Sequence, residues 1–538
     1  MKRALLSKCG ILPLIMLAVL CSSCVKQLLP GQAMSSPKIA GETKVKELLE
    51  TRDQKLVPPP LEAPAVSGPR SDAMVLSLQE AVLMGLEHNQ NFQVERLKPA
   101  ISRTAEEVER AVFDPLLSGT VSRSKGPDLS TSRTRGLSTP RQDGTIETTQ
   151  SQATLSQATS LGATIELSAD EDKLALEDAD VSSRQQNWDL TITQALLRGR
   201  GPDVTLARLR QSRLDTEISL YELQGAAEAL VAQIEQGYWD VILAKRALEI
   251  YEQSHAIAKQ QVEEVSERIK VGALAENELA AAEAEAAGRY QQLVTARGTL
   301  AKARLGLLRS VNPGGQVDWA ADFSLNEAPE MPDMTVDTVD SHVALALSKR
   351  PDLNQARLLV QRRDLEVTQT KNGLLPKLDL FVSLGGSRYS NSFAGQDNDM
   401  SAEKVYAGGL TLELPLWNRA AKARHAAAGW SLEQANAALV NMEQLAQVDV
   451  RSAHVDVEQA GAKVKAAEFT ALLREKTYAL EQEKFRLGRS STLLVAQAQR
   501  DLVQSQIAQA EAVVGARKAL LDLYRLEGSL LAHRGIVP

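Results

Sequence analysis

The sequence contains few aromatic residues, few cysteines and no recognisable catalytic motif. Aromatic side chains occupy 4% of the 538 positions, a low share for a chain of this length with a compact globular core. The six histidines are scattered without metal-ligand spacing, and the patterns HExxH and GxSxG are absent. The sequence therefore predicts neither an enzyme nor a cofactor or metal site.

Charge and cysteine content narrow the possibilities further. The net charge is −7, which gives no reason to expect nucleic-acid binding. Of the three cysteines, Cys9 and Cys21 fall in an N-terminal segment with the features of an export signal. Removal of that segment would leave Cys24 alone, so a disulfide framework is excluded.

The N-terminal segment consists of a basic start, an apolar run over 11–20 and two serines before Cys24. This arrangement resembles a bacterial lipoprotein signal, in which residues 1–23 are removed and Cys24 becomes the lipidated, palmitate-bearing first residue. Such signals usually have leucine three residues before the cysteine, where this chain has Cys21. Ordinary cleavage nearby is the alternative. Residues 24–75 are rich in proline and are expected to form an extended tether.

The rest of the chain contains an internal duplication. Segments 85–122 and 346–383 align without a gap at an offset of 261, with Leu86 against Leu347 and Pro115 against Pro376. Segments 190–197 and 410–417 match at an offset of 220. The first copy therefore holds about 41 extra residues between its two matched segments.

Period-two alternation of apolar and polar residues predicts β-strands at 115–124, 188–196, 376–384 and 410–416. Such segments are typical of an outer-membrane β-barrel, although a soluble, half-buried sheet would show the same alternation. The extra residues near 149–170 suggest another strand pair around Leu161 and Gly162. This pair could extend the barrel strands as a hairpin above the membrane or add strands to the wall, and the pattern does not choose between them.

Long helices follow the strands in each copy. Residues 203–270 and 420–487 contain no proline and could each approach about 100 Å as a helix. Gly272 and Gly488 then stand in matching contexts, 216 positions apart, before returning helices of about 35 residues. Two such glycines indicate chain reversals, and helices of this length are expected to pack side by side in coiled-coil fashion.

Several segments occur in an order that repeats. They are LSLQEAVLMGLEHN, LTITQALLRGRG, RIKVGALAENEL, LPKLDLFVSLGG, LTLELPLWNRA and KFRLGRSSTLL. Together they resemble the TolC-like outer-membrane efflux protein family, in its lipoprotein branch. The resemblance covers 76–311 and 340–530, with a linker at 312–339 and a C-terminal tail at 531–538.

The resemblance implies an α+β fold built from a duplicated helix-strand-strand-helix-helix unit. It implies a homotrimer in which each chain supplies four strands to one twelve-stranded transmembrane β-barrel, continued by a long periplasmic α-helical coiled-coil tunnel. The implied function is a passive exit duct for a tripartite efflux pump or a type I secretion system. The implied partners are outer-membrane lipid, a periplasmic adaptor (membrane fusion) protein and, through the adaptor, an inner-membrane pump.

The resemblance also assigns the two glycine reversals. They would be hairpin tips at the periplasmic end that receive the adaptor, formed by Val271, Gly272 and Ala273 and by Leu487, Gly488 and Arg489. A helix C-cap without a binding role is the alternative, and the two roles are compatible.

Residues that follow the tip glycines are expected at the pore entrance. Members of the family often carry acidic residues six and nine positions after the second tip glycine, where this chain has Leu494 and Gln497. In the first copy Glu278 holds the six-residue position, and we hypothesise that it faces the pore entrance and pairs with Arg489 in the closed state. Two solvated tip charges are the alternative.

A second function of a different class also fits the helices. A structural periplasmic lipoprotein could tether the envelope through its coiled coils without forming a pore. The alternating segments beside Trp188 and Trp417 argue against it, because a tether needs no such strands and these aromatics stand where the girdles of a barrel would lie. The sequence names neither the cargo nor the cognate pump.

Overall fold

A computed structural model describes residues 74–127, 131–134, 137–140, 145–176, 181–272, 274–312, 319, 323–325, 331–393, 396–399 and 403–536. They all fall within one compact unit, residues 69–538. The expected signal 1–23, the lipidation site Cys24 and nearly all of the tether 24–75 lie outside the described residues. Within those ranges, none of the helices combines the length and the apolar composition that a membrane span requires.

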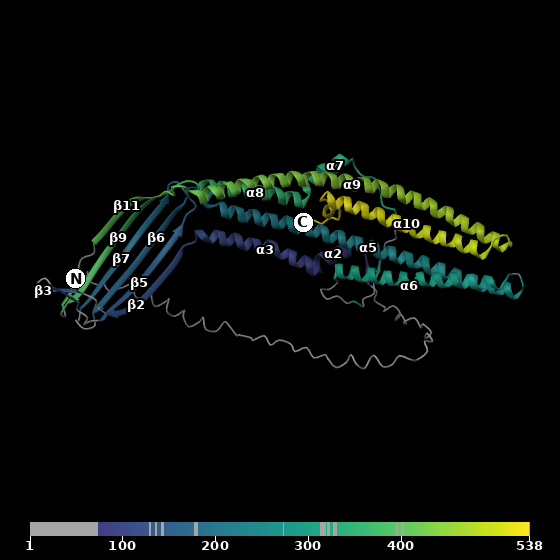
Figure 1. The fold of residues 1–538 in the computed structure, drawn as a ribbon, viewed down its shortest axis with the longest axis horizontal. Helices are drawn as coiled ribbons and strands as arrows, with labels where there is room; N and C mark the ends of the chain where they lie inside the picture. Colours follow the sequence, from purple (N-terminus) through teal and green to yellow (C-terminus); the bar gives the residue numbers. More distant parts are fainter. Residues whose placement is uncertain are drawn as a thin grey trace, which may run out of the picture. The chain divides into compact units, whose positions relative to one another are not determined.

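Two long helical hairpins, one from each copy of the repeat, are the largest elements (Figure 1). In the first copy α5 runs Ala207–Lys270 and returns as α6, Asn277–Val311. In the second copy α9 runs Arg419–Arg486 and returns as α10, Thr492–Leu526. At 1.5 Å per residue, α5 and α9 are each about 100 Å long. The long helices and the returning helices predicted from the sequence are confirmed.

Shorter helices precede the strands of each copy. They are α2 (Leu78–His88), α3 (Gln90–Arg110) and the 3₁₀ turn η3 (Ala111–Phe113) in the first copy, and α7 (Val339–Lys349) and α8 (Pro351–Asn372) in the second. Single helical turns form α4 (Pro202–Thr205) and α11 (Leu530–His533). Helix α3 packs along α5, α5 along α8 and α8 along α9, so these four helices form one layer next to the sheet (Figure 1).

The main sheet is antiparallel and joins the two copies. Its long strands follow the order β2-β5-β6-β7-β9-β11, and the short β10 pairs with the end of β9. Their bounds are β2 Leu116–Pro127, β5 Thr145–Ala158, β6 Ala163–Leu176, β7 Val181–Ala195, β9 Lys377–Phe393, β10 Gln396–Asp399 and β11 Glu403–Glu413. The four strands predicted from alternation correspond to β2, β7, β9 and β11. The strand pair predicted around Leu161 and Gly162 is β5 and β6.

Two small strand pairs complete the described β-structure. Strand β1 (Met74–Leu76) pairs in parallel with β8 (Phe323–Leu325), and β3 (Thr131–Thr134) pairs with β4 (Leu137–Pro140). The β1–β8 pair packs against the middle of α5, because Leu76 and Phe323 join its core cluster.

The principal hydrophobic core lies around the middle of α5 rather than against the sheet. Ile234, Tyr238 and Trp239 are buried there against α2, the end of α6 and the end of α10. Leu530 and Leu531 of α11 are buried in the same cluster, and Arg534 donates to the buried carboxylate of Glu235 with a 2.6 Å Nε–Oε1 separation. The C-terminal segment is therefore packed against α5 as far as residue 536.

Candidate functional site at the hairpin tips and on the sheet

Each long helix ends at a glycine that reverses the chain. Gly272 has φ +74° and Gly488 has φ +71°, in the left-handed region where a Cβ is strained. The Gly488 N–H donates to the Phe485 carbonyl at 3.0 Å, and the Arg489 N–H donates to the Lys484 carbonyl at 2.8 Å. Such bonds satisfy the last carbonyls of a helix. The helix C-cap proposed for these glycines is therefore present at both tips.

The tips present apolar side chains and a cation to solvent. Val271 is 77% exposed and Leu487 is 62% exposed, and Leu493 at the start of α10 is equally open. Apart from the neighbouring residues along the chain, no atom lies within 4 Å of the Cβ position of Gly272 or Gly488, so both reversals are open to solvent. Ala273, the remaining predicted residue of the first tip, lies outside the described residues.

The two hairpins contact each other just behind their tips. The guanidinium of Arg268 on α5 lies 4.7 Å from the centre of the Phe485 ring on α9, and its Nη1 donates to the Phe485 carbonyl at 3.4 Å. Phe485 is buried with Val265 of α5 and Val495 of α10. We call the contact of Arg268 with Phe485 and its apolar cluster the tip lock. No pattern in the sequence indicates this contact, although Phe485 stands in the KFRLG segment quoted above.

The two residues expected at the pore entrance lie near different tips. Glu278 is half-buried at the start of α6, and Arg489 is exposed just after Gly488. Among the described residues of a single chain neither forms an ion pair, whereas Lys270 pairs with Glu267 and Arg486 with Glu483. Their pairing in a closed trimer stays a prediction.

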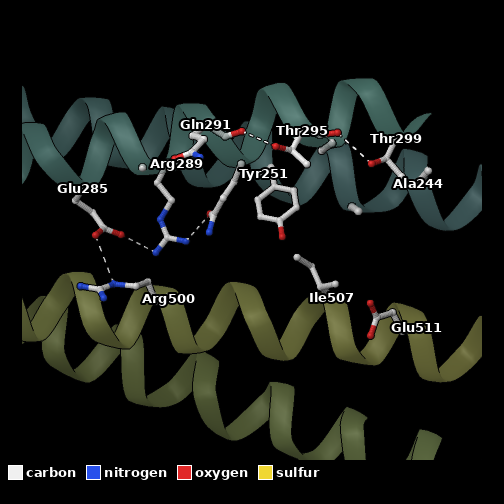
Figure 2. Close-up of a pocket in the computed structure, with 14 residues that line it drawn as sticks. Ala244, Tyr251, Glu285, Arg289, Gln291, Thr295, Thr299, Arg500, Ile507 and Glu511 are labelled. Atoms are coloured by element: carbon white, nitrogen blue, oxygen red, sulfur yellow. Dashed lines mark hydrogen bonds and ion pairs between the residues drawn. The ribbon is translucent and has the colours of Figure 1, made fainter. Parts of the chain in front are cut away.

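Farther from the tips, a groove of about 590 Å³ separates the first hairpin from α10 (Figure 2). Glu285 of α6 lies between two cations there. Its Oε1 is 2.7 Å from Nη2 of Arg289 on the same helix, and its Oε2 is 3.4 Å from Nε of Arg500 on α10. Arg289 is almost completely buried and also donates to Gln292 at 3.1 Å. Glu285 therefore links the two hairpins through charge.

Among the described residues that line the groove there is no cysteine, serine or histidine. Figure 2 shows Glu511 of α10 at the opposite end of the groove from Glu285, so the groove carries carboxylates as well as guanidiniums. Within the described residues no cluster of His, Cys, Asp and Glu side chains could hold a metal ion. The chemistry of this groove is that of a charged helix–helix contact.

Burial also alters the acidity of a carboxylate in α5. Glu228 of α5 is buried, and this burial raises its pKa from the ordinary 4.5 to about 7. The Gln224 amide donates to its Oε1 at 3.4 Å, and the positive charge of Arg525 opposes the rise.

The main sheet has one apolar and one polar face. One row of directly paired residues crosses its six long strands and is apolar throughout: Leu117, Leu155, Leu167, Leu190, Leu384 and Tyr406. A second row of directly paired residues lies three positions away along each strand, on the opposite face of the sheet. This row is polar throughout: Thr120, Gln152, Asp170, Asn187, Ser387 and Glu403. We call them the apolar row and the polar row.

The apolar row has no covering layer within the described part of the chain. Leu117 is 67% exposed and Tyr406 71%, and Trp188 on the same face is also open. On the polar face, Asp189 accepts hydrogen bonds from Thr191 and Ser383, and Asn187 donates to Asp170 at 2.7 Å. An uncovered apolar face opposite a hydrogen-bonded polar face suits a sheet with lipid on one side and water on the other.

Comparison with known proteins decides the family. Residues 343–529, nearly the whole second copy, match the profile of the family described as outer membrane efflux protein. This part of the chain belongs to the outer membrane efflux protein family. The family recognised from the sequence is thereby confirmed. No curated protein sequence matches the chain significantly.

Solved outer membrane channels share the fold over most of both chains. The outer-membrane channel OprN superposes with a TM-score of 0.62 at 17% identity, covering 84% of this chain and 90% of its own. The VceC outer membrane protein of Vibrio cholerae gives 0.61 at 14% identity, with 84% and 96% covered. The CmeC outer membrane channel of Campylobacter jejuni gives 0.58 at 16% identity, with 84% and 86% covered. The expected α+β fold of long helices and antiparallel strands is confirmed.

Proposed function

We propose that three copies of this chain form a passive exit duct in the outer membrane. The observation that carries the proposal is the two-faced sheet, which places an uncovered apolar row and a polar row on opposite sides of the same six strands. In a closed assembly the apolar row faces lipid and the polar row lines water. The helical hairpins continue this path on the periplasmic side, as an efflux protein of this family requires.

The tips are the part of the duct that meets a partner. Exposed Val271 and Leu487 flank the reversals at Gly272 and Gly488, and Arg489 adds a cation. We assign Val271–Ala273 and Leu487–Arg489 as the surface that receives a periplasmic adaptor, through which an inner-membrane pump or a secretion system would deliver cargo. The energy for transport then comes from the pump, because the described residues present no catalytic arrangement of their own.

Two further features belong to the same proposal. The mature chain begins at lipidated Cys24, which ties 24–75 to the membrane surface, and residues 76–311 and 340–530 are the two efflux-protein repeats. Glu278 narrows the pore entrance and meets Arg489 of a neighbouring copy when the tips are closed. The supporting observation is that neither side chain is engaged in an ion pair within the described part of one chain.

Function is tested by purification in detergent and reconstitution in planar lipid bilayers. We expect heat-modifiable trimers from the outer-membrane fraction and a small current that rises in Glu278→Ala and Arg489→Ala. Unchanged conductance in both variants would contradict the role of Glu278 and Arg489 at the pore entrance, but it would not contradict the proposal of an exit duct. A monomeric periplasmic species that never carries current would instead support a coiled-coil tether.

Adaptor binding is tested separately by crosslinking. Cysteines placed at Ala273 and Arg489 should capture the adaptor in cells, whereas a cysteine at exposed Lys302, far along α6, should not. Equal capture at all three positions would contradict docking at the tips.

A further inference from the structure

The first copy contributes two more long strands to the main sheet than the second. Strand β5 pairs with β2 from the cross-strand pair of Leu116 and Ser156 to that of Pro127 and Thr145. Strand β6 pairs with β7 from the pair of Ala163 and Gln194 to that of Leu176 and Val181. We propose that three copies close an eighteen-stranded barrel, in place of the twelve-stranded barrel that the family resemblance implies. This inference rests on the proposed function, because it concerns the width of the same duct.

The turn between β5 and β6 is fixed at the helical end of the sheet. Gly162 in this turn has φ +86°, and a Cβ there would lie 2.2 Å from the carbonyl oxygen of Gly199, in the segment that leads into α4. The Leu161 carbonyl accepts from the Gly201 N–H at 3.2 Å, and the Thr205 hydroxyl donates to the Ser160 carbonyl. A hairpin held at this end runs along the wall from its base. It is therefore not an extension above the membrane, which decides the question that the sequence left open.

The added strands follow the two-faced pattern of their neighbours. Leu155 of β5 and Leu167 of β6 occupy the apolar row between Leu117 and Leu190. Gln152 and Asp170 occupy the polar row in the same way. A strand pair that lay outside the membrane would have no reason to keep its apolar side chains in register with the lipid-facing ones.

The two edges of the sheet suit closure with further copies. In the described residues β2 pairs only with β5, and β11 pairs only with β9. Each edge therefore presents unpaired N–H and carbonyl groups, which within lipid must be satisfied by another strand. Strand β2 leaves the helices and β11 returns to them, so β2 of one copy meets β11 of the next in antiparallel orientation. Three six-strand sheets close as an even-numbered antiparallel barrel.

The width of the sheet agrees with the width of the helical layer. Four helices packed side by side, α3, α5, α8 and α9, span about 36 Å at about 9 Å each. Six strands about 4.8 Å apart and tilted by about 40° span about 38 Å, whereas four strands span only about 25 Å. Around the whole trimer, eighteen strands give a backbone diameter of about 36 Å and twelve strands about 24 Å.

The test is electron cryomicroscopy of the purified full-length trimer, with the barrel measured in cross-section. We expect a diameter of about 36 Å and eighteen strands in the native protein. Deletion of residues 145–180 joins the loop after β2 directly to β7, and it should reduce the diameter by about one third. Deletion of 131–140, which removes only the β3–β4 pair, should leave the diameter unchanged.

The outcomes separate the two proposals. A trimer with a twelve-stranded barrel of about 24 Å and β5–β6 outside its wall would overturn this inference and leave the duct intact. A particle without a closed barrel would overturn the proposed function as well. If the 145–180 deletion fails to assemble, the native cross-section alone decides.

Discussion

Phe485→Ala is the substitution that most directly tests how the tips are held together. A buried phenylalanine removes about 200 Å² from water, which at about 25 cal/mol per Å² corresponds to about 5 kcal/mol. The cation–π contact with Arg268 adds about 1 kcal/mol. Because Phe485 joins Val265 of one hairpin to Val495 of the other, this loss falls on the tip lock and not on the core around α5.

We therefore expect local opening of the tips without global unfolding. Alanine keeps part of this buried area, and Phe→Ala substitutions in cores cost about 3–5 kcal/mol, so the expected loss is about 4 kcal/mol. This loss corresponds to a roughly 1000-fold increase in the population of open tips. Hydrogen–deuterium exchange of the trimer should become correspondingly faster over the last turns of α5 and α9, and unchanged around Tyr238. The control is Arg486→Ala, which removes only an exposed ion pair with Glu483 and should change exchange little. Equal protection at the tips of Phe485→Ala and the native protein would refute the tip lock.

Three further substitutions test the helical part. Burial raises the pKa of Glu228 above its unfolded value, so the stability associated with its bound proton is present below about pH 4.5 and is lost as pH rises through 7. Glu228→Gln should remove this dependence of stability on pH. In denaturant titrations at pH 8 it should raise the free energy of unfolding by up to about 3 kcal/mol. Arg534→Ala should destabilise the protein by about 2–4 kcal/mol, because it breaks an ion pair that joins Arg534 to buried Glu235 through two contacts. The stability of Arg534→Lys should lie between those of Arg534→Ala and the native protein. Equal melting temperatures for both variants and the native protein would contradict this role. Gly488→Ala should lower the free energy of unfolding by only about 1 kcal/mol, since a φ of +71° is strained for alanine but the added Cβ has open space around it. A loss above about 3 kcal/mol in the same titration would show that the tip is packed against another chain in the assembly.

The helical part of the fold could be predicted because its signals are local. Long proline-free runs, returning runs of similar length and a glycine between them define the two hairpins, and the positive φ of Gly272 and Gly488 is the backbone conformation that such a glycine permits. The contacts between the hairpins could not be predicted. Arg289 is one of many charged residues on a helix, and nothing in its neighbours along the chain shows that α10 covers it.

The long strands of the sheet could be predicted, but the position of β5 and β6 within it could not, for a physical reason. Strands β9 and β11 are rich in leucine, so their alternation is strong. Strand β5 instead places Leu155 among serine, threonine and glutamine, and in β6 the alternation around Leu167 gives way to a run of acidic residues, which weakens the period-two signal. Their place in the wall depends on register with β2 and β7 and on the docking of Gly162 against Gly199, which are contacts between distant segments.

The packing of the C-terminal segment could not be predicted from its sequence. Its short sequence, 531–538, has no periodicity from which to predict packing. The structure buries Leu530 and Leu531 and bonds Arg534 to Glu235, which lies 299 positions earlier. Such a contact is decided by the folded arrangement of both repeats, because the end of α10 brings the segment to the middle of α5.

Access of water to the two faces of the sheet tests the central claim most directly. Asn187 lies in the polar row and Leu190 in the apolar row of the same strand, β7, and each is replaced by cysteine in a separate variant, Asn187→Cys and Leu190→Cys. In trimers reconstituted in a planar bilayer, a charged, membrane-impermeant thiol reagent should react with the Asn187→Cys variant and reduce its current. The same reagent should leave the Leu190→Cys variant unmodified. Equal modification of both variants, or modification of Leu190→Cys alone, would contradict a sheet that has lipid on one face and a water-filled duct on the other.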